Sequence, residues 1–304
     1  MFLTPKAIEA FLAIVEHGSL GRAADVLGLT QPALSRIIKR LETQLEVPVF
    51  ERGSRGMMLT AYGEALRPYA SLLHSESEHA MQEIDAIRGL KRGVVRIGTV
   101  ASAAVMVLPA VIKSFLARRP HLTIQIIEGV EDKLVEALIA NEIDLAIASS
   151  IEPDETIVRL THQKFTDIYS VIAAPEHPAV RSGATSLEEL EGYQWVMPPK
   201  KAEPRRHFEE LVRATGRTPP RIGVETRSIE TIKALVARGG FLGWLPEPLF
   251  EAERVANWVA CVPIEPLAIR RDFYVYRVPR SLTAPAVSEL LRELRMFDNV
   301  TPEA

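Results

Sequence analysis

The chain has little cysteine, no long apolar run and little net charge. Its single thiol, Cys261, excludes a disulfide framework, a zinc cluster or a dithiol switch within one chain, and fits a reducing compartment. The first residues, MFLTPKAIEAFLAIVEHG, have neither a basic leader nor a small-residue cleavage site, and no segment is apolar for long enough to span a bilayer. We therefore expect a cytoplasmic protein with no membrane partner.

Patterns typical of catalytic and metal centres are also missing. The seven histidines show no HxH, HxxxH or Cys–His spacing, which argues against a metal site. There is no Gly-rich phosphate loop, no GxSxG, no pair of carboxylates in a cleft motif and no Cys–His nucleophile arrangement. The sequence therefore predicts no catalytic residue, no metal and no cofactor.

What is present is enough chain for two domains: 304 residues, of which 47% are hydrophobic and 25% charged. The net charge of −3 gives no general argument for nucleic-acid binding, and residues 1–60 hold seven basic groups against six acidic ones. The basic groups are clustered, however, with Arg36, Lys39 and Arg40 in one segment and Arg52 and Arg55 in another. Such local clusters are what a DNA-binding surface requires.

Residues 23–42, AADVLGLTQPALSRIIKRLE, predict two helices joined by a tight turn. Apolar residues recur at helical spacing on both sides of the turn. Gly28 suits the end of one helix, Thr30 or Gln31 the N-cap of the next, and Pro32 its first turn. On the exposed face of this second helix, side chains that can reach base edges and phosphates are Gln31, Ser35, Arg36, Lys39 and Arg40. The stretch is therefore interpreted as a helix-turn-helix.

The flanking segments extend this interpretation. Helical spacing of apolar residues predicts a first helix at residues 5–17, and two glycines bracketing arginines predict a β-hairpin with a basic tip within residues 45–60. Residues 61–90 predict one long helix with an uneven apolar stripe. That stripe either packs on the chain's own core or on a second copy. We favour the second copy, because a head of 60 residues offers little core surface.

From Gly93 onward, predicted strands and helices alternate. Strands are expected at residues 94–98, 122–127 and 145–148, with helices at 103–117 and 131–140 between them, and a second such set follows from residue 168. Arg96-Ile97-Gly98 and Arg221-Ile222-Gly223 both lead a strand into a helix. The fold class is therefore α/β, with parallel strands covered by helices in two similar lobes, and ligands bind such folds at the strand carboxyl ends.

Together these segments resemble a LysR-type transcriptional regulator over nearly the whole chain. The resemblance rests on the order and spacing of AFLAIVEHGSLGRAADVLGLTQPALSRIIKRLE, VFERGSRGMMLTAYGE, a long helix, RIGTV and a two-lobed tail. It implies a winged helix-turn-helix DNA-binding domain at 1–60, a linker and dimerisation helix at 61–90, and a periplasmic-binding-protein-like effector domain at 91–304. Within that domain, lobe I would take 91–161 and 267–304 and lobe II 162–266.

The resemblance also implies partners. These are double-stranded promoter DNA, a second copy of the chain bound through the linker helix, and a homotetramer that occupies two DNA sites and bends the DNA between them. RNA polymerase is a further candidate partner. A small organic effector would bind between the two lobes; an organic acid, an aromatic acid and a sugar derivative all remain open.

By motif match, Gln31, Pro32, Ser35 and Arg36 would enter the major groove. Gln31 suits adenine, Arg36 suits guanine, and the Pro32 ring can touch a thymine methyl. Lys39 and Arg40 would meet phosphates, Arg55 the minor groove, and Arg52 the backbone or a carboxylate such as Glu51. The alternative for each is a solvated basic face; Thr30 and Thr60 either bond phosphate or cap helices.

Candidate effector-binding residues stand at strand-to-helix turns of the tail, and are Ser102, Val130, Pro199, Arg205, Ser228 and Trp244. Family alignment puts Ser102 at a common ligand-contact position. At the position of Val130, many carboxylate-binding members carry Thr or Ser. The Val130 side chain has no hydroxyl, so it cannot donate the hydrogen bond with which those residues hold a carboxylate. Arg205 lies with Pro199 in a charged, proline-rich stretch and could pair with an anion in fork geometry. The alternatives are an outward-facing loop for this stretch, an N-cap for Ser228 and a core position for Trp244.

Two other classes of protein compete with the regulator. The tail alone would allow a solute-binding protein, but such receptors are usually exported and lack about 90 preceding residues of this kind. An enzyme on a two-lobed α/β scaffold would need one of the motifs that are missing here. Sequence-specific DNA binding separates the regulator from both.

Overall fold

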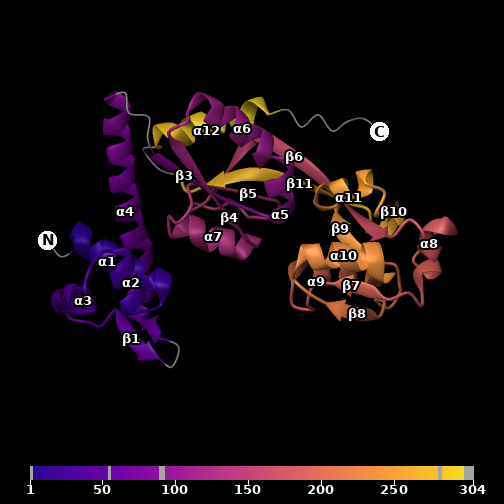
Figure 1. Cartoon of the computed structure of the whole chain (residues 1–304), viewed down its shortest axis with the longest axis horizontal. Coiled ribbons are helices and arrows are strands. Elements are labelled where there is room, and N and C mark those ends of the chain that lie inside the picture. The colour runs from indigo at the N-terminus through magenta and orange to yellow at the C-terminus, as the bar shows by residue number, and fades with distance from the viewer. Residues whose placement is uncertain (1–2, 54–55, 89–92, 280–282, 298–304) are drawn as a thin grey trace. The chain divides into compact units, whose positions relative to one another are not determined.

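The computed structural model describes residues 3–53, 56–88, 93–279 and 283–297, which fall into two compact units (Figure 1). The first unit contains the described residues up to Thr99, together with Val111–His162 and Val275–Phe297. The second unit contains Val100–Ala110 and Gln163–Tyr274. The element order confirms the predicted class: a small helical head with a hairpin, a long helix, and then alternating strands and helices.

The three N-terminal helices follow the predicted boundaries closely, and are α1 (Pro5–His17), α2 (Leu20–Val26) and α3 (Gln31–Leu45). The Thr4 hydroxyl accepts a hydrogen bond from the amide of Ala7 and caps α1, while Gly18 ends it with φ of 60°. The apolar faces of the helices meet in one core, whose most buried members include Phe11, Ile14, Leu34 and Leu41. Burial of these side chains holds the turn between α2 and α3 in place.

The hairpin consists of β1 (Phe50–Gly53) and β2 (Gly56–Leu59), which pair antiparallel. Its second strand is hydrogen-bonded to the residue that ends α1: the amide of Met57 donates to the carbonyl of Gly18 at 2.9 Å. Gly56 has φ of 116°, and a Cβ atom there would lie 2.4 Å from the Gly18 oxygen, so only glycine fits. The hairpin is therefore a wing fixed to the helical head.

The long helix α4 (Ala61–Ile87) uses one face for the head and leaves another uncovered. Leu66 and Ala70 pack on the N-terminal core. Other apolar side chains of α4 are 45% to 65% exposed: Tyr62, Tyr69, Leu73, Met81 and Ile84. Of the two alternatives for this stripe, packing on the chain's own core therefore does not account for these five residues.

The remaining elements of the first unit surround three parallel strands, β3 (Gly93–Thr99), β4 (Leu122–Glu128) and β5 (Leu145–Ala148). Figure 1 shows α12 (Pro285–Met296) and α6 (Leu108–Arg118) on one side of these strands and α7 (Glu131–Ile139) on the other. The single helix predicted at residues 103–117 is wrong, since α5 (Ala101–Met106) ends before α6 begins. Pro109 in the first turn of α6 explains the break, because proline starts helices readily and interrupts them elsewhere.

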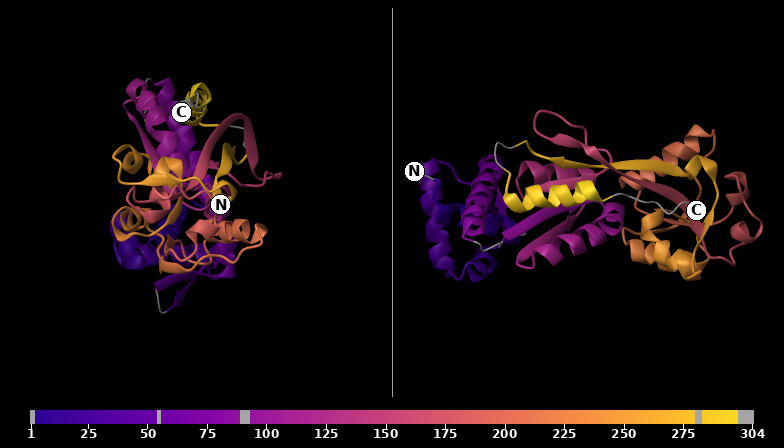
Figure 2. Two further views of the ribbon diagram at one scale, coloured as in Figure 1. Left: turned by 90° about the vertical axis from the view of Figure 1, so that its right-hand side faces the viewer. Right: turned by 90° about the horizontal axis from the view of Figure 1, so that it is seen from above.

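The strands of the tail run in the order β10-β6-β11-β5-β3-β4, with β9 paired to β6. The two long neighbouring strands, β6 and β11, can be followed by their colours in the right-hand view of Figure 2. The strand predicted to begin at residue 168 begins at Val158, and β6 (Val158–Ala173) pairs antiparallel with β9 (Gly243–Pro246) and β10 (Ala260–Val262). A wholly parallel sheet is therefore wrong. Polar side chains in the first half of β6 hid its length, since the prediction relied on its apolar end.

The other elements include the long strand β11 (Ile269–Arg277) and a parallel pair, β7 (Trp195–Met197) and β8 (Ile222–Glu225). The helices that accompany them are α8 (Pro178–Arg181), α9 (Glu203–Ala214), α10 (Ile229–Gly239) and α11 (Glu251–Val255), with three short 3₁₀ turns at Glu188–Leu190, Glu247–Leu249 and Glu265–Leu267.

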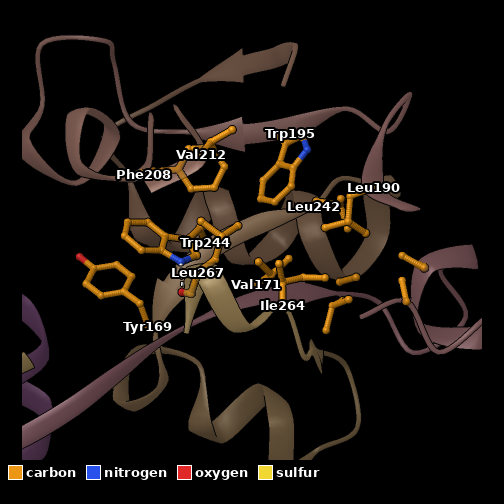
Figure 3. Packing of buried hydrophobic residues seen from close by; sticks show 14 of the residues in the cluster. Tyr169, Val171, Leu190, Trp195, Phe208, Val212, Leu242, Trp244, Ile264 and Leu267 are labelled. Carbon is orange, nitrogen blue, oxygen red and sulfur yellow. Dashed lines mark hydrogen bonds between the residues drawn. The ribbon is translucent and has the colours of Figure 1, made fainter. Parts of the chain in front are cut away.

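A row of aromatic rings forms the core of the second unit (Figure 3). Tyr169 stacks on Trp244 with ring centroids 4.0 Å apart, Trp244 lies 5.5 Å from Phe208, and Phe208 lies 5.1 Å from Trp195. The indole N–H of Trp244 donates to the carbonyl of Leu267 at 2.8 Å. We refer to these four rings as the ring row.

Helix α8 provides a prediction about pH. His177 is buried, and its Nδ1 accepts a hydrogen bond from the amide of Ala179 at 3.1 Å, which only an unprotonated Nδ1 can do. Burial lowers the pKa of His177 below its usual 6.5, so the unfolded chain takes up the proton first. The free energy of unfolding should therefore decrease as pH falls below 6.5 through the lowered pKa of the folded state.

Urea unfolding of wild type and His177→Asn over this pH range tests whether His177 causes this loss of stability. The asparagine oxygen caps a helix in the same way but does not titrate, so the variant should lose less stability on acidification. Equal pH dependence in the two proteins would contradict it.

Candidate functional site

Helix α3 presents a polar and basic face to solvent. All six side chains predicted to face DNA from this helix are exposed, namely Gln31, Pro32, Ser35, Arg36, Lys39 and Arg40. On the opposite face Leu34, Ile38 and Leu41 are buried in the core of the head. A 3.6-residue period places these two sets on different sides of one helix, which is the arrangement that a recognition helix needs.

The cations on this face keep their charge available to a ligand. Arg36 Nε donates to the carbonyl of Pro32, one turn earlier, at 3.4 Å, which directs its guanidinium along the exposed surface. Within the described part of the chain, Lys39 and Arg40 form no salt bridge. The face can therefore take anionic partners such as phosphates without first breaking an ion pair.

The two threonines at this surface cap helices, as one of their alternatives predicts. Thr30 Oγ1 accepts from the amide of Ala33 at 3.3 Å. Thr60 Oγ1 accepts from the amide of Gly63 at 3.2 Å and donates to the carbonyl of Pro48 at 2.7 Å. In the wing, Arg52 is exposed, whereas Arg55 lies outside the described residues.

A polar cluster in the second unit brings Ser102 together with two residues that the sequence analysis missed. The Arg271 guanidinium donates to Asp167 from Nε at 3.1 Å and from Nη2 at 2.7 Å, and Nη2 also donates to Ser102 Oγ at 3.1 Å. The Asp167 side chain is fully buried and that of Arg271 is 18% exposed. Arg271 also lies over the rings of Tyr169 at 4.4 Å and Phe273 at 4.9 Å.

This cluster is held rigidly and leaves a donor on the serine. The paired contact with Asp167 and the two rings fix the guanidinium plane. Since Ser102 Oγ accepts from Arg271, the hydroxyl proton can point to another acceptor. The missed residues had a signal, because Asp167 and Arg271 each precede by two positions a core aromatic in the same strand and so share its face. A charged side chain that faces the core from a strand indicates a functional site more strongly than a charged side chain in a solvated loop does.

Arg205 lies in a different environment from the one predicted. Helix α9 begins at Glu203, so Arg205 belongs to the helix instead of the loop before it, and its side chain is buried. Its Nε donates to Glu209 at 2.7 Å, and Arg213 donates to the other oxygen of Glu209 at 2.5 Å. Burial by itself would raise the pKa of Glu209, but the hydrogen bonds from Arg213 and Arg205 outweigh it and lower that pKa. An internal carboxylate therefore already binds Arg205 through Nε, while the buried Nη1 has no hydrogen-bond partner among the described residues.

The other candidates are distributed over both units. Trp244 is 1% exposed in the ring row, and Ser228 caps α10 by accepting from the amide of Thr231 at 3.2 Å. Pro199 is half-buried in a turn, with its carbonyl accepting from Ala202 at 2.8 Å. Val130, the N-cap residue of α7, is 55% exposed and belongs to the first unit, so its position relative to Ser102 is not described.

Comparison with known proteins identifies the family. The model of the bacterial regulatory helix-turn-helix proteins of the LysR family matches residues 5–64, and that of the LysR substrate binding domain matches residues 88–297. The chain belongs to the LysR family of transcriptional regulators. The uncharacterised HTH-type transcriptional regulator YdcI of Escherichia coli K12 is 30% identical over 240 residues, which cover 79% of this chain and 78% of that protein.

Solved structures of LysR-type proteins have the same fold. Full-length OxyR from Pseudomonas aeruginosa, solved as a variant, superimposes with a TM-score of 0.71 at 20% identity, covering 99% of both chains. Full-length CbnR, solved in complex with its target DNA, superimposes with a TM-score of 0.65 at 19% identity, covering 97% of this chain and 99% of that one. These likenesses confirm the fold of this LysR regulator: a winged helix-turn-helix, a long helix and a two-lobed α/β domain.

Family membership confirms the main functional prediction. This LysR regulator is a DNA-binding transcriptional regulator with an effector-binding domain, and its relatives are named as transcriptional regulators. Within the described residues, no helix is long and apolar enough to cross a membrane, and no group of three or more His, Cys, Asp or Glu side chains could hold a metal ion.

Proposed function

We propose that the exposed face of α3 reads base edges in the major groove of promoter DNA. The observation that carries this proposal is the unpaired basic face opposite Leu34 and Ile38. Gln31, Ser35 and Arg36 would contact bases and Pro32 a thymine methyl, while Lys39 and Arg40 would contact phosphates. In the wing, Arg52 would meet the backbone and Arg55 the minor groove.

A second copy of the chain would pair with the exposed stripe of α4. Tyr69, Leu73 and Ile84 recur at spacings of four and eleven residues, which keeps them on one side of a helix. Pairing of two such helices would bring two heads to one operator, and two pairs would give the homotetramer. CbnR, whose structure was solved with its target DNA, supports binding of DNA by this fold. A cytoplasmic location and contact with RNA polymerase complete the proposal.

Binding to DNA from upstream of the chain's own gene, compared with a shuffled duplex of the same composition, tests this function. Fluorescence anisotropy over a range of salt concentrations should show tighter binding to the upstream duplex at every salt concentration, since phosphate contacts alone are common to both. Equal affinity for both duplexes would contradict the proposal.

The effector that fits the second unit best is a small organic acid. Ser102 retains a hydroxyl proton for an acceptor beside the Arg271 guanidinium, whose charge is already paired with Asp167. A carboxylate next to Ser102 would accept that proton in a charge-assisted hydrogen bond. Of the three effector classes that the sequence leaves open, organic and aromatic acids therefore come before a sugar derivative, and Ser102 is the contact we place first.

Replacing Ser102 by alanine should weaken binding of the acid by about tenfold or more, because a hydrogen bond to a charged group contributes roughly 1.5–3 kcal/mol. The acid is first found by thermal shift with succinate, benzoate and gluconate, one from each class, and with metabolites of neighbouring genes. Titration calorimetry then compares wild type with the Ser102→Ala variant.

The matched control is Ser182→Ala. The Ser182 hydroxyl donates to the carbonyl of Ala179 within the same unit. It should bind the acid as wild type does. An unchanged dissociation constant in the Ser102→Ala variant would remove Ser102 from the site.

A further inference from the structure

The second unit contains a cavity that no part of the proposed function uses. Its volume is about 310 Å³, within the range of small-molecule sites. The segment from Leu187 to Trp195 forms one wall, and Val212, Arg217 and Arg221 contribute to the other. We call this cavity the lobe II pocket.

Trp195 lines the lobe II pocket and carries a buried indole N–H. Its side chain is completely buried, yet Nε1 has no hydrogen-bond partner among the described residues. The neighbouring Trp244 in the ring row does have one, the carbonyl of Leu267. Figure 3 shows the Trp195 nitrogen on the side of the ring that faces away from Phe208 and Trp244. Because buried donors are nearly always satisfied, this N–H points to an acceptor that the chain does not supply.

One of the two arginines that line the lobe II pocket is available to an anionic acceptor. Arg217 is held by Glu188 and Glu191, with both N–O distances 2.9 Å. Arg221 is exposed and forms no ion pair within the described part of the chain. Its carbonyl accepts from the amide of Trp195 at 3.4 Å, so Arg221, which directly precedes β8, meets Trp195 through the backbone, and both residues line the pocket.

Apolar side chains supply the remaining surface. Leu187, Leu190 and Val212 line the lobe II pocket together with the indole. A ligand pocket that combines apolar walls with a few polar groups selects an apolar body with one polar end. The ring row lies between this pocket and Arg271, since Tyr169 and Trp195 are at its two ends.

We propose that the lobe II pocket is a second binding site, separate from the Ser102 cluster, for a carboxylate with a flat apolar body. The carboxylate accepts from Trp195 Nε1 and pairs with Arg221, and the apolar body packs on Leu187 and Leu190. The proposal is independent of the identity of the effector at Ser102.

Fluorine NMR of the full chain labelled with fluorotryptophan tests the site, with naphthoate as the probe. Signals of Trp195, Trp244 and Trp258 are assigned from single Trp→Phe variants. Naphthoate should shift the Trp195 signal, with a dissociation constant of about 1 mM or tighter, as expected for a ligand with roughly 13 non-hydrogen atoms. Trp258, which is 58% exposed and does not line the pocket, should not respond.

Two variants examine the contacts, with calorimetry as the readout. Trp195→Phe should weaken naphthoate binding about tenfold or more, because it removes only the donor and part of the ring. Arg221→Gln replaces an exposed side chain, so the fold should stay intact. It should weaken naphthoate binding about threefold or more. Trp258→Phe is the matched control and should bind as wild type does, and Ser102→Ala should leave the Trp195 response unchanged.

Three results would overturn the proposal. One is the absence of a Trp195 shift at saturating naphthoate. Another is unchanged affinity in both Trp195→Phe and Arg221→Gln. The third is equal affinity for naphthalenemethanol, which has the same ring but no charge.

Discussion

Replacing Arg36 by alanine should lower the discrimination between the operator and unrelated DNA by roughly 1–3 kcal/mol at one base pair. Arg36 is exposed on α3 and bonded to the carbonyl of Pro32, so its guanidinium is held near the exposed helix surface that we propose faces DNA. A bidentate contact to guanine contributes about 1–3 kcal/mol against the wrong base. Operator affinity should therefore fall roughly 5- to 150-fold, while affinity for shuffled DNA changes little.

Two matched variants make this result specific. Lys39→Ala removes a cation from the same face, and should weaken binding to operator and shuffled DNA alike, with a salt dependence smaller by about one ion. Arg295→Ala removes an exposed arginine from α12 and should change neither affinity. If Arg36→Ala behaved as Lys39→Ala does, Arg36 would be a phosphate contact.

Replacing Trp244 by alanine should cost the second unit about 3–5 kcal/mol of stability, the range for a large aromatic removed from a core. Trp244 is 1% exposed, stacks on Tyr169 and lies beside Phe208 in the ring row. The change also leaves the carbonyl of Leu267 without its indole partner. Urea unfolding followed by circular dichroism and by the fluorescence of Trp195 should show the loss.

The matched control is Trp258→Ala. Trp258 is 58% exposed, so its removal should change the free energy of unfolding by less than about 0.5 kcal/mol. A loss below about 1 kcal/mol in Trp244→Ala would mean that the ring row is not a structural core and would strengthen a ligand-binding role for Trp244.

Local patterns accounted for the head because its residues obey short-range rules. Thr4, Thr30 and Gly18 mark helix ends through their own side chain or backbone freedom, and Leu34 and Ile38 mark the buried face by spacing alone. The tail followed such rules less well. The antiparallel pairs of β6 depend on which strand becomes its neighbour, and that is a long-range property.

Side-chain partners in the tail were equally hidden. Arg205 lies in a charged, proline-rich stretch that predicts a ligand clamp. In the structure, however, its Nε donates to Glu209, one turn later in the same helix. Conversely, Asp167 and Arg271 are 104 residues apart and become partners only when β6 and β11 pair. Sequence spacing shows which groups can meet within a helix, whereas groups on different strands meet through the sheet order.

The sequence by itself determined that this protein is a DNA-binding regulator of the LysR family, and which face of α3 is basic. Helical periodicity, caps and a family pattern over nearly the whole chain suffice for that. Only the tertiary structure decided which polar groups of the tail are satisfied internally and which are not. The Trp244 N–H has a partner, whereas the Trp195 N–H has none among the described residues, because burial and hydrogen bonding depend on packing between distant segments.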